Sequence, residues 1–155
     1  MKALVFSDSH GRVRPMADAL ELYRPDAVFH LGDVVRDGDS LQTHCTHIPF
    51  YQVPGNCDHN LTGLAEEQLA RLEGKTILYL HGHTQRVKLG VGAAVKKAQQ
   101  LGADILLFGH THRPLIAQYD TLTVVNPGAA QDGRAALLIW TPESAVEAIP
   151  VELSR

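Results

Sequence analysis

Apolar residues in the first third of the chain form three short runs with a helical pattern between the first two. The runs Lys2–Phe6, Ala27–Leu31 and Ile48–Val53 each end in small and polar residues that are typical of turns, and they predict buried strands. Val13–Tyr23 carries apolar residues at helical spacing and predicts an amphipathic helix. The succession of strand, helix and strand indicates a mostly parallel sheet covered by helices.

The pattern in the middle of the chain is compatible with two structures. Glu66–Leu72 favours a helix by composition, but a hairpin that pairs Gln68–Glu73 with Thr76–Leu80 fits equally well. Further on, Val91–Leu101 predicts a helix and Ile105–Phe108 a strand. Short apolar runs separated by turn residues make up the last third, so we expect it to be all-β and antiparallel.

Composition is that of an ordinary folded protein. With 155 residues, 45% of them hydrophobic and 20% charged, the chain has the size of one domain, and we expect a single domain over residues 1–155. No apolar run approaches the roughly 20 residues of a membrane span. The net charge of −3 offers no basic surplus for nucleic acid. Two cysteines, Cys45 and Cys57, exclude a disulfide framework and fit a cytoplasmic location.

Polar residues gather directly after five of the apolar runs. Ligands of open α/β sheets bind beyond the carboxyl ends of the strands, so we expect these loops to meet in space. The chain also has nine histidines, more than its tyrosines and phenylalanines together, which suggests a metal site or acid–base chemistry. The clusters are Asp8-Ser9-His10, Gly32-Asp33, Gly55-Asn56-Cys57-Asp58, His81-Gly82-His83 and Gly109-His110-Thr111-His112.

The side chains of these clusters suit a pair of metal ions. Carboxylate oxygens, imidazole nitrogens and one amide oxygen favour Mn, Fe, Co, Ni or Zn over a calcium site built of oxygen alone. Seven candidate ligands exceed the need of one tetrahedral ion and suffice for two ions when one carboxylate bridges them. The seven are Asp8, His10, Asp33, Asn56, His81, His110 and His112.

In order and type, the five clusters resemble the signature of the calcineurin-like metallophosphoesterases. Asn126-Pro127-Gly128 is similar to a later motif of their small bacterial and archaeal phosphodiesterase branch. The resemblance implies an α/β fold, a four-layer α/β/β/α sandwich with the site at one edge. It also implies hydrolysis of a phosphodiester by a hydroxide that bridges two divalent metal ions, with Mn²⁺ expected and Ni²⁺, Fe²⁺, Zn²⁺ or Co²⁺ as alternatives. The implied ligands are Asp8, His10 and His112 for one ion, Asn56, His81 and His110 for the other, and Asp33 as the bridge.

Two positions depart from the family pattern. Cys57 stands where many family phosphatases have a histidine on the leaving-group side, and Ala129 stands where the branch usually has serine. Because a thiol is a poor proton donor at neutral pH, we expect a diester rather than a monoester as substrate. With no room for a cap domain, the open site should accept varied or large diesters.

Four residues are expected to act in catalysis, two of them also as metal ligands. His83 could orient substrate or donate a proton, and it could equally fix the position of His81. Asp58 could orient a ligand histidine or contact substrate, and it could equally cap a turn or a helix. The four are Asp33, Asn56, Asp58 and His83.

The other histidines and the possible partners complete the expectations. His30, inside an apolar run, predicts a hydrogen-bonded core residue, whereas His44 and His47 are expected at the surface or at an interface; His59 is assigned no role. The expected partner is a small phosphodiester. The alternatives are a protein-interaction module on the same fold and a nuclease. The apolar C-terminal region could form a contact in a homo-oligomer.

Overall fold

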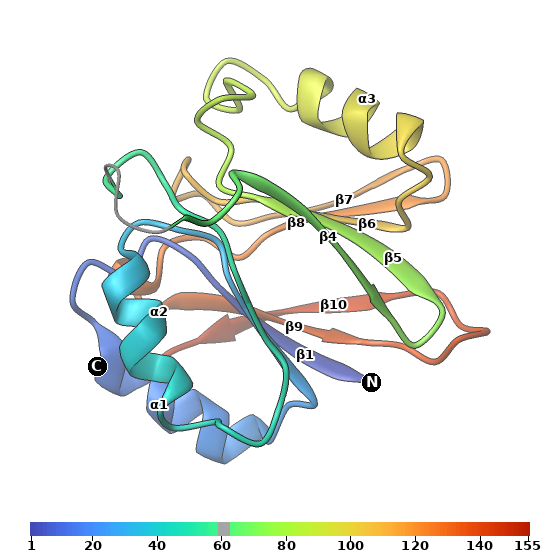
Figure 1. Ribbon diagram of the computed structural model, residues 1–155. Helices are drawn as coiled ribbons and strands as arrows, with labels where there is room; N and C mark the ends of the chain where they lie inside the picture. The colour runs from blue at the N-terminus through green and yellow to red at the C-terminus, as the bar shows by residue number, and fades with distance from the viewer. Residues whose placement is uncertain (59–62) are drawn as a thin grey trace.

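The computed structural model describes residues 1–58 and 63–155 and consists of two five-stranded sheets packed face to face (Figure 1). The first sheet has the order β10-β9-β1-β2-β3. Its strands are β1 (Lys2–Phe6), β2 (Ala27–His30), β3 (Phe50–Gln52), β9 (Arg134–Ile139) and β10 (Glu147–Glu152). β1, β2 and β3 are parallel, whereas β9 and β10 each run antiparallel to their neighbours. Helices α1 (Val13–Tyr23) and α2 (Val35–Gln42) cover its outer face.

The second sheet has the order β4-β5-β6-β8-β7, with helix α3 (Gly92–Gln100) on its outer face (Figure 1). Its strands are β4 (Glu67–Leu72), β5 (Lys75–Leu80), β6 (Ile105–Leu107), β7 (Leu115–Tyr119) and β8 (Leu122–Asn126). β4 and β5 form an antiparallel hairpin, so the helical alternative for this segment is wrong. Among the helices of the described residues, none has the length and apolar character that crossing a bilayer requires.

The two sheets bury one hydrophobic core between them and two more beneath the helices, which confirms the four-layer α/β/β/α sandwich. Ala3 and Val5 of β1 face the second sheet, while Leu4 and Phe6 face α1. Successive strand residues point to opposite faces, so a strand buried on both sides must be apolar throughout. This explains why the first apolar run shows no polar alternation.

Two features of the fold differ from expectation. Helix α2 was not predicted, because its sequence contains a glycine and two aspartates; it is held by tertiary contacts, among them Asp37 Oδ2, which accepts hydrogen bonds from Ser9 Oγ (2.7 Å) and Gly11 N (2.6 Å). The C-terminal third is all-β apart from the short 3-10 helix η1 (Ala130–Asp132), but it is not wholly antiparallel. β8 lies between β7 and β6, and it runs antiparallel to β7 but parallel to β6.

His30 is a buried core residue, as predicted, and it makes stability depend on pH. Ser9 Oγ donates its proton to Asp37, so it accepts from His30 Nε2 at 3.1 Å. Burial lowers the pKa of His30 to about 4, so the folded protein keeps this imidazole neutral. The unfolded chain takes up the proton near pH 6.5, and the stability that His30 contributes is therefore lost as pH falls from about 6.5 toward 4.

We expect the substitution His30→Gln to flatten this pH dependence. Between pH 7 and pH 5 the wild type should lose about 2 kcal/mol more unfolding free energy than the variant. Urea denaturation in metal-free buffer at both pH values measures the difference. Equal losses of unfolding free energy in the two proteins between pH 7 and pH 5 would contradict a neutral buried imidazole. A variant that is less stable at both pH values can still be compared, because only the difference between the two pH values is used.

Candidate metal centre

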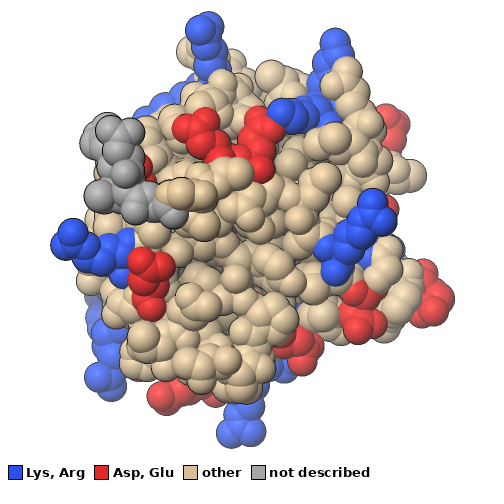
Figure 2. Space-filling model, in the orientation of Figure 1, with Lys and Arg blue, Asp and Glu red and all other residues tan. Residues whose placement is uncertain are grey.

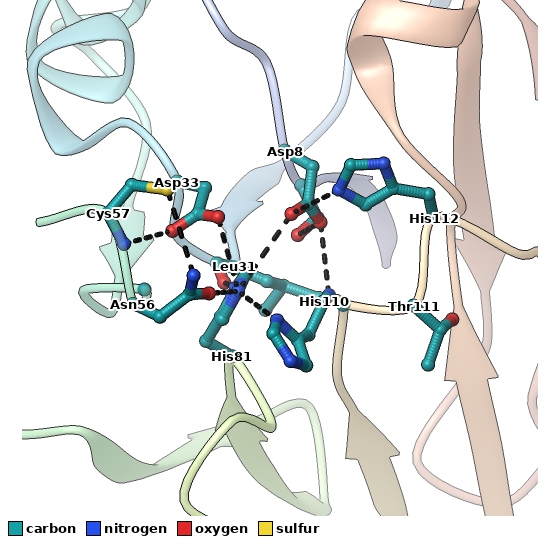
Figure 3. Close-up of polar contacts among 12 residues, drawn as sticks. Asp8, Leu31, Asp33, Asn56, Cys57, His81, His110, Thr111 and His112 are labelled. Atoms are coloured by element: carbon teal, nitrogen blue, oxygen red, sulfur yellow. Dashed lines mark hydrogen bonds and ion pairs between the residues drawn. The ribbon is translucent and has the colours of Figure 1, made fainter. Parts of the chain in front are cut away.

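The loops that follow five strands meet at one edge of the sandwich, as the sequence predicted (Figure 3). Within the first sheet, the amide of Asp8 donates to the carbonyl of Gly32 at 2.9 Å. Within the second, the amide of Gly109 donates to the carbonyl of His81 at 2.9 Å. These hydrogen bonds continue the parallel strand pairing into the loops, and they hold the polar clusters side by side.

Asp8 lies at the centre of the group and is fully buried. Its Oδ2 accepts hydrogen bonds from Ser7 Oγ (2.5 Å) and from the amide of His110 (3.1 Å). Its Oδ1 lies 3.1 Å from Nε2 of His112 (Figure 3). One carboxylate oxygen is thus used to hold the loop, and the other faces the histidines.

Asp33 is arranged in the same way. Its Oδ1 accepts a hydrogen bond from the amide of Cys57 at 2.9 Å, while its Oδ2 lies 3.6 Å from Nε2 of His81 and 4.0 Å from Nε2 of His10. Burial alone would raise the pKa of Asp33, but the hydrogen bond from Cys57 and the neighbouring His81 ring outweigh it and lower that pKa below its usual value. Asp33 is therefore an ionised carboxylate aimed at the site.

Asp58 holds the loops through their backbone. Its Oδ2 accepts hydrogen bonds from the amides of Asp33 (3.0 Å) and Gly55 (2.9 Å), and its Oδ1 accepts from the amide of Val35 (2.8 Å) at the start of α2. Of the roles considered for Asp58, the structure places it in the turn and helix-capping one. It positions Asp33 and is turned toward amides rather than into the site.

His81 and Asn56 present two lone pairs to one another. Nδ1 of His81 lies 2.7 Å from the carbonyl of Leu31, which can only accept, so Nδ1 carries the proton. In the neutral ring Nε2 then has a lone pair, and it lies 3.0 Å from the amide oxygen of Asn56 (Figure 3). Two lone pairs that converge without a proton repel each other unless a cation lies between them. This donor set fits a divalent metal ion.

His110 contributes a neutral ring to the same place. Its Nδ1 lies 3.2 Å from Nε2 of His81. Burial, together with the nearby His81 ring and the charge of Lys88, lowers the pKa of His110 to about 4. An imidazole that stays unprotonated at neutral pH is suited to coordinate a metal ion.

Among the described residues, the candidate ligand atoms form two groups, and within each group the atoms lie within 4.8 Å of one another. The first contains Asp8, His10 and His112, which is the set expected for one ion. The second contains Asp8, Asp33 and His81, and Asn56 and His110 adjoin it through His81. All seven expected ligands therefore lie together, and Asp8 is the carboxylate that the two groups share.

His83 lies beside the candidate ligands. Its ring centroid is 5.5 Å from that of His81 and 6.2 Å from that of His110. Its Nε2 is 3.6 Å from a carboxylate oxygen of Glu66, and its buried Nδ1 has no hydrogen-bond partner among the described residues. The ring is therefore close to the site and retains a free nitrogen.

The structure shows the surroundings of the two departures from the family pattern. Burial and the neighbouring Asp33 raise the pKa of the Cys57 thiol, which favours its protonated form. Ala129 is fully buried.

His30, His44 and His47 are not part of this group. His44 and His47 are exposed between α2 and β3, as expected for surface residues. His59 lies outside the described residues.

Two side chains to which the sequence assigned no role support the site. Asn126 donates from Nδ2 to the carbonyl of Gly109 (3.1 Å) and to Thr111 Oγ1 (3.0 Å), and so holds the loop that carries two ligand histidines. Gln131 Nε2 lies 3.3 Å from Nδ1 of His112. The Asn-Pro-Gly motif was a signal for Asn126, but nothing in the sequence around Gln131 marks it.

Residues 1–140 match the calcineurin-like phosphoesterase superfamily domain, and the chain belongs to this family. A probable metallophosphoesterase of Bacillus subtilis is 32% identical over 135 residues, which cover 83% of this chain and 75% of the relative. A phosphodiesterase of Methanocaldococcus jannaschii is 26% identical over 149 residues, covering 83% of each chain.

Solved structures share the fold. A conserved protein of Streptococcus pneumoniae, described as a predicted phosphoesterase, aligns with a TM-score of 0.77 and 25% identity, covering 96% of this chain and 97% of that one. Vps29 of Entamoeba histolytica in complex with Zn²⁺ aligns with a TM-score of 0.74 and 22% identity, covering 98% of this chain and 99% of that one. The second likeness concerns the fold alone.

Proposed function

We propose that this protein, as a single unit over residues 1–155, hydrolyses phosphodiesters with two divalent metal ions. The observation that carries the proposal is the convergence of carboxylates and imidazoles, with Nε2 of His81 and the amide oxygen of Asn56 facing each other. Family membership supports a phosphoesterase. The phosphodiesterase among the relatives supports a diester as substrate.

In this proposal Asp8, His10 and His112 would hold one ion, and Asn56, His81 and His110 would hold the other. Asp33 would be the bridge, because its Oδ2 faces one histidine of each set, His10 at 4.0 Å and His81 at 3.6 Å. Bound together, two divalent cations supply a nucleophilic hydroxide at neutral pH and neutralise charge on the phosphoryl oxygens. The hydrogen bonds that Ser7 and Cys57 donate, and the one that the Leu31 carbonyl accepts from His81, orient the ligands, so that the site is formed before substrate arrives. Mn²⁺ is the proposed metal.

The proton for the leaving group is assigned to His83. Its ring lies beside His81 and His110 and is partly exposed, whereas the Cys57 thiol is a weak proton donor. A diester with a stable leaving anion needs little help from such a donor. This supports a diester substrate over a monoester of an ordinary alcohol.

The test is hydrolysis of bis(p-nitrophenyl) phosphate by protein loaded with Mn²⁺, next to p-nitrophenyl phosphate. We expect kcat/KM for the diester to exceed that for the monoester by about tenfold or more. Elemental analysis should find two metal ions per chain, and Ni²⁺, Fe²⁺, Zn²⁺ and Co²⁺ are compared in the same assay. Loaded protein that leaves the diester intact would overturn the proposal.

A non-catalytic interaction module is the second candidate, because Vps29 shares this fold. The completeness of the ligand set favours the enzyme. A nuclease is less favoured: the net charge is −3, and among the described residues drawn in Figure 2 the Lys and Arg side chains are scattered over this face rather than gathered in a stripe. A protein that binds no divalent metal would favour the interaction module.

A further inference from the structure

A groove with a volume of about 490 Å³ opens next to the candidate metal centre. This volume lies within the range of pockets that bind small molecules, roughly 300–1,000 Å³. Its walls come from the loop between β5 and α3, from the loop after β6 and from the start of β7, which adjoin one another in Figure 1. The lining residues are Val87, Lys88, Val91, Phe108, Thr111, Arg113, Pro114 and Leu115.

The groove combines apolar walls with two cations. Val91 and Leu115 are half-buried along it, while Lys88 and Arg113 are exposed. No acidic residue lines it, and within residues 1–58 and 63–155 neither cationic side chain has an ion-pair or hydrogen-bond partner. Two uncompensated positive charges beside an apolar wall favour an anionic ligand with an apolar body.

The groove adjoins the loop that carries two of the candidate metal ligands. Thr111 lines it and stands between His110 and His112. A ligand in the groove therefore lies beside this loop.

A larger groove of about 910 Å³, lined by Gly11 and Gln131 among others, lacks this character, because three of its four cationic side chains already have partners. Arg14 forms an ion pair with Asp18 (2.9 Å), and Arg134 forms one with Glu152 (3.2 Å). Arg12 donates to the carbonyl of Gln131 at 3.1 Å. The positive charge of this larger groove is thus offset by acidic residues that also line it.

We propose that the groove between Lys88 and Arg113 binds one organic arm of the substrate and selects an aromatic or apolar group that carries a further negative charge. This inference rests on the proposed function, since the other end of the ligand is the phosphoryl group at the metal centre. It assigns a specificity-determining role to the two cations and no role in the chemical step.

Three phosphonates test the groove, since their carbon–phosphorus bond is not hydrolysed: ethylphosphonate, phenylphosphonate and 4-carboxyphenylphosphonate. Their dissociation constants are measured by calorimetry with Mn²⁺-loaded protein, and their inhibition constants against bis(p-nitrophenyl) phosphate. In the wild type we expect 4-carboxyphenylphosphonate to bind about tenfold more tightly than ethylphosphonate, because burial of the ring adds to the charge. In K88Q/R113Q this preference should fall about fivefold, the effect of losing two exposed ion pairs.

A matched control removes the same charge elsewhere. Arg71 and Lys96 are exposed and do not line the groove, and K96Q/R71Q should keep the wild-type preference. An unchanged preference in K88Q/R113Q, or an equal fall in both double variants, would overturn the inference. Absence of diester turnover alongside a preference that only K88Q/R113Q loses would count against the proposed function and leave the groove supported, so the two failures are distinguishable.

Discussion

The variant Asp33→Asn is expected to lose about a thousandfold in kcat/KM for bis(p-nitrophenyl) phosphate. Asp33 is ionised and turns Oδ2 toward two of the candidate ligand histidines. Asparagine has nearly the same shape, but it replaces the charge of the proposed bridge with a neutral amide. The loss should be accompanied by fewer bound metal ions per chain, measured by elemental analysis after dialysis.

Asp33 has a left-handed backbone conformation, so the substitution and its control must both tolerate a positive φ. Asp33 has φ 42° and Asp120, in the turn between β7 and β8, has φ 54°. Asparagine tolerates this conformation, so neither substitution strains the chain. Asp120→Asn should therefore retain full activity and metal content. An Asp33→Asn protein that keeps both would remove the bridging carboxylate from the proposed mechanism.

The largest loss of stability is expected for Gly32→Ala. Gly32 has φ +95°, which side-chain-bearing residues rarely adopt, and a Cβ there would lie 2.6 Å from the backbone nitrogen of Gly55. Backbone atoms cannot rotate away, so the two loops must separate. We expect a loss of about 3 kcal/mol of unfolding free energy, from strain and overpacking together. This corresponds to a Tm lower by roughly 10 °C, measured by calorimetry.

The same substitution should also lower activity, because the carbonyl of Gly32 accepts the amide of Asp8 and the neighbouring Asp33 would move with it. Gly92→Ala is the matched control. Gly92 is the first residue of α3, and a Cβ there meets nothing within 4 Å. Its Tm should stay the same or rise slightly, since alanine restricts the unfolded chain. A Gly32→Ala protein as stable as this control would contradict the close approach of the two loops.

The candidate ligands and the strands that precede them could be predicted from the sequence alone. Ligand type is a property of single residues, and an apolar run followed by a glycine turn is a local pattern, so Asp8, Asp33 and His110 could be recognised before their meeting was visible. The family resemblance predicted the four-layer sandwich, and the two packed sheets confirm this prediction.

The pairing of the segments and the contacts of the supporting polar groups follow only from the tertiary structure. The β4–β5 hairpin, the polar helix α2 and the parallel placement of β8 depend on contacts with segments distant in the chain, which local periodicity does not encode. The same holds for Asp58, whose carboxylate serves backbone amides of loops more than twenty residues away, at Asp33 and Val35. A buried carboxylate is stabilised where backbone amides have no other acceptor. These amides lie close together only after the loops have packed against one another.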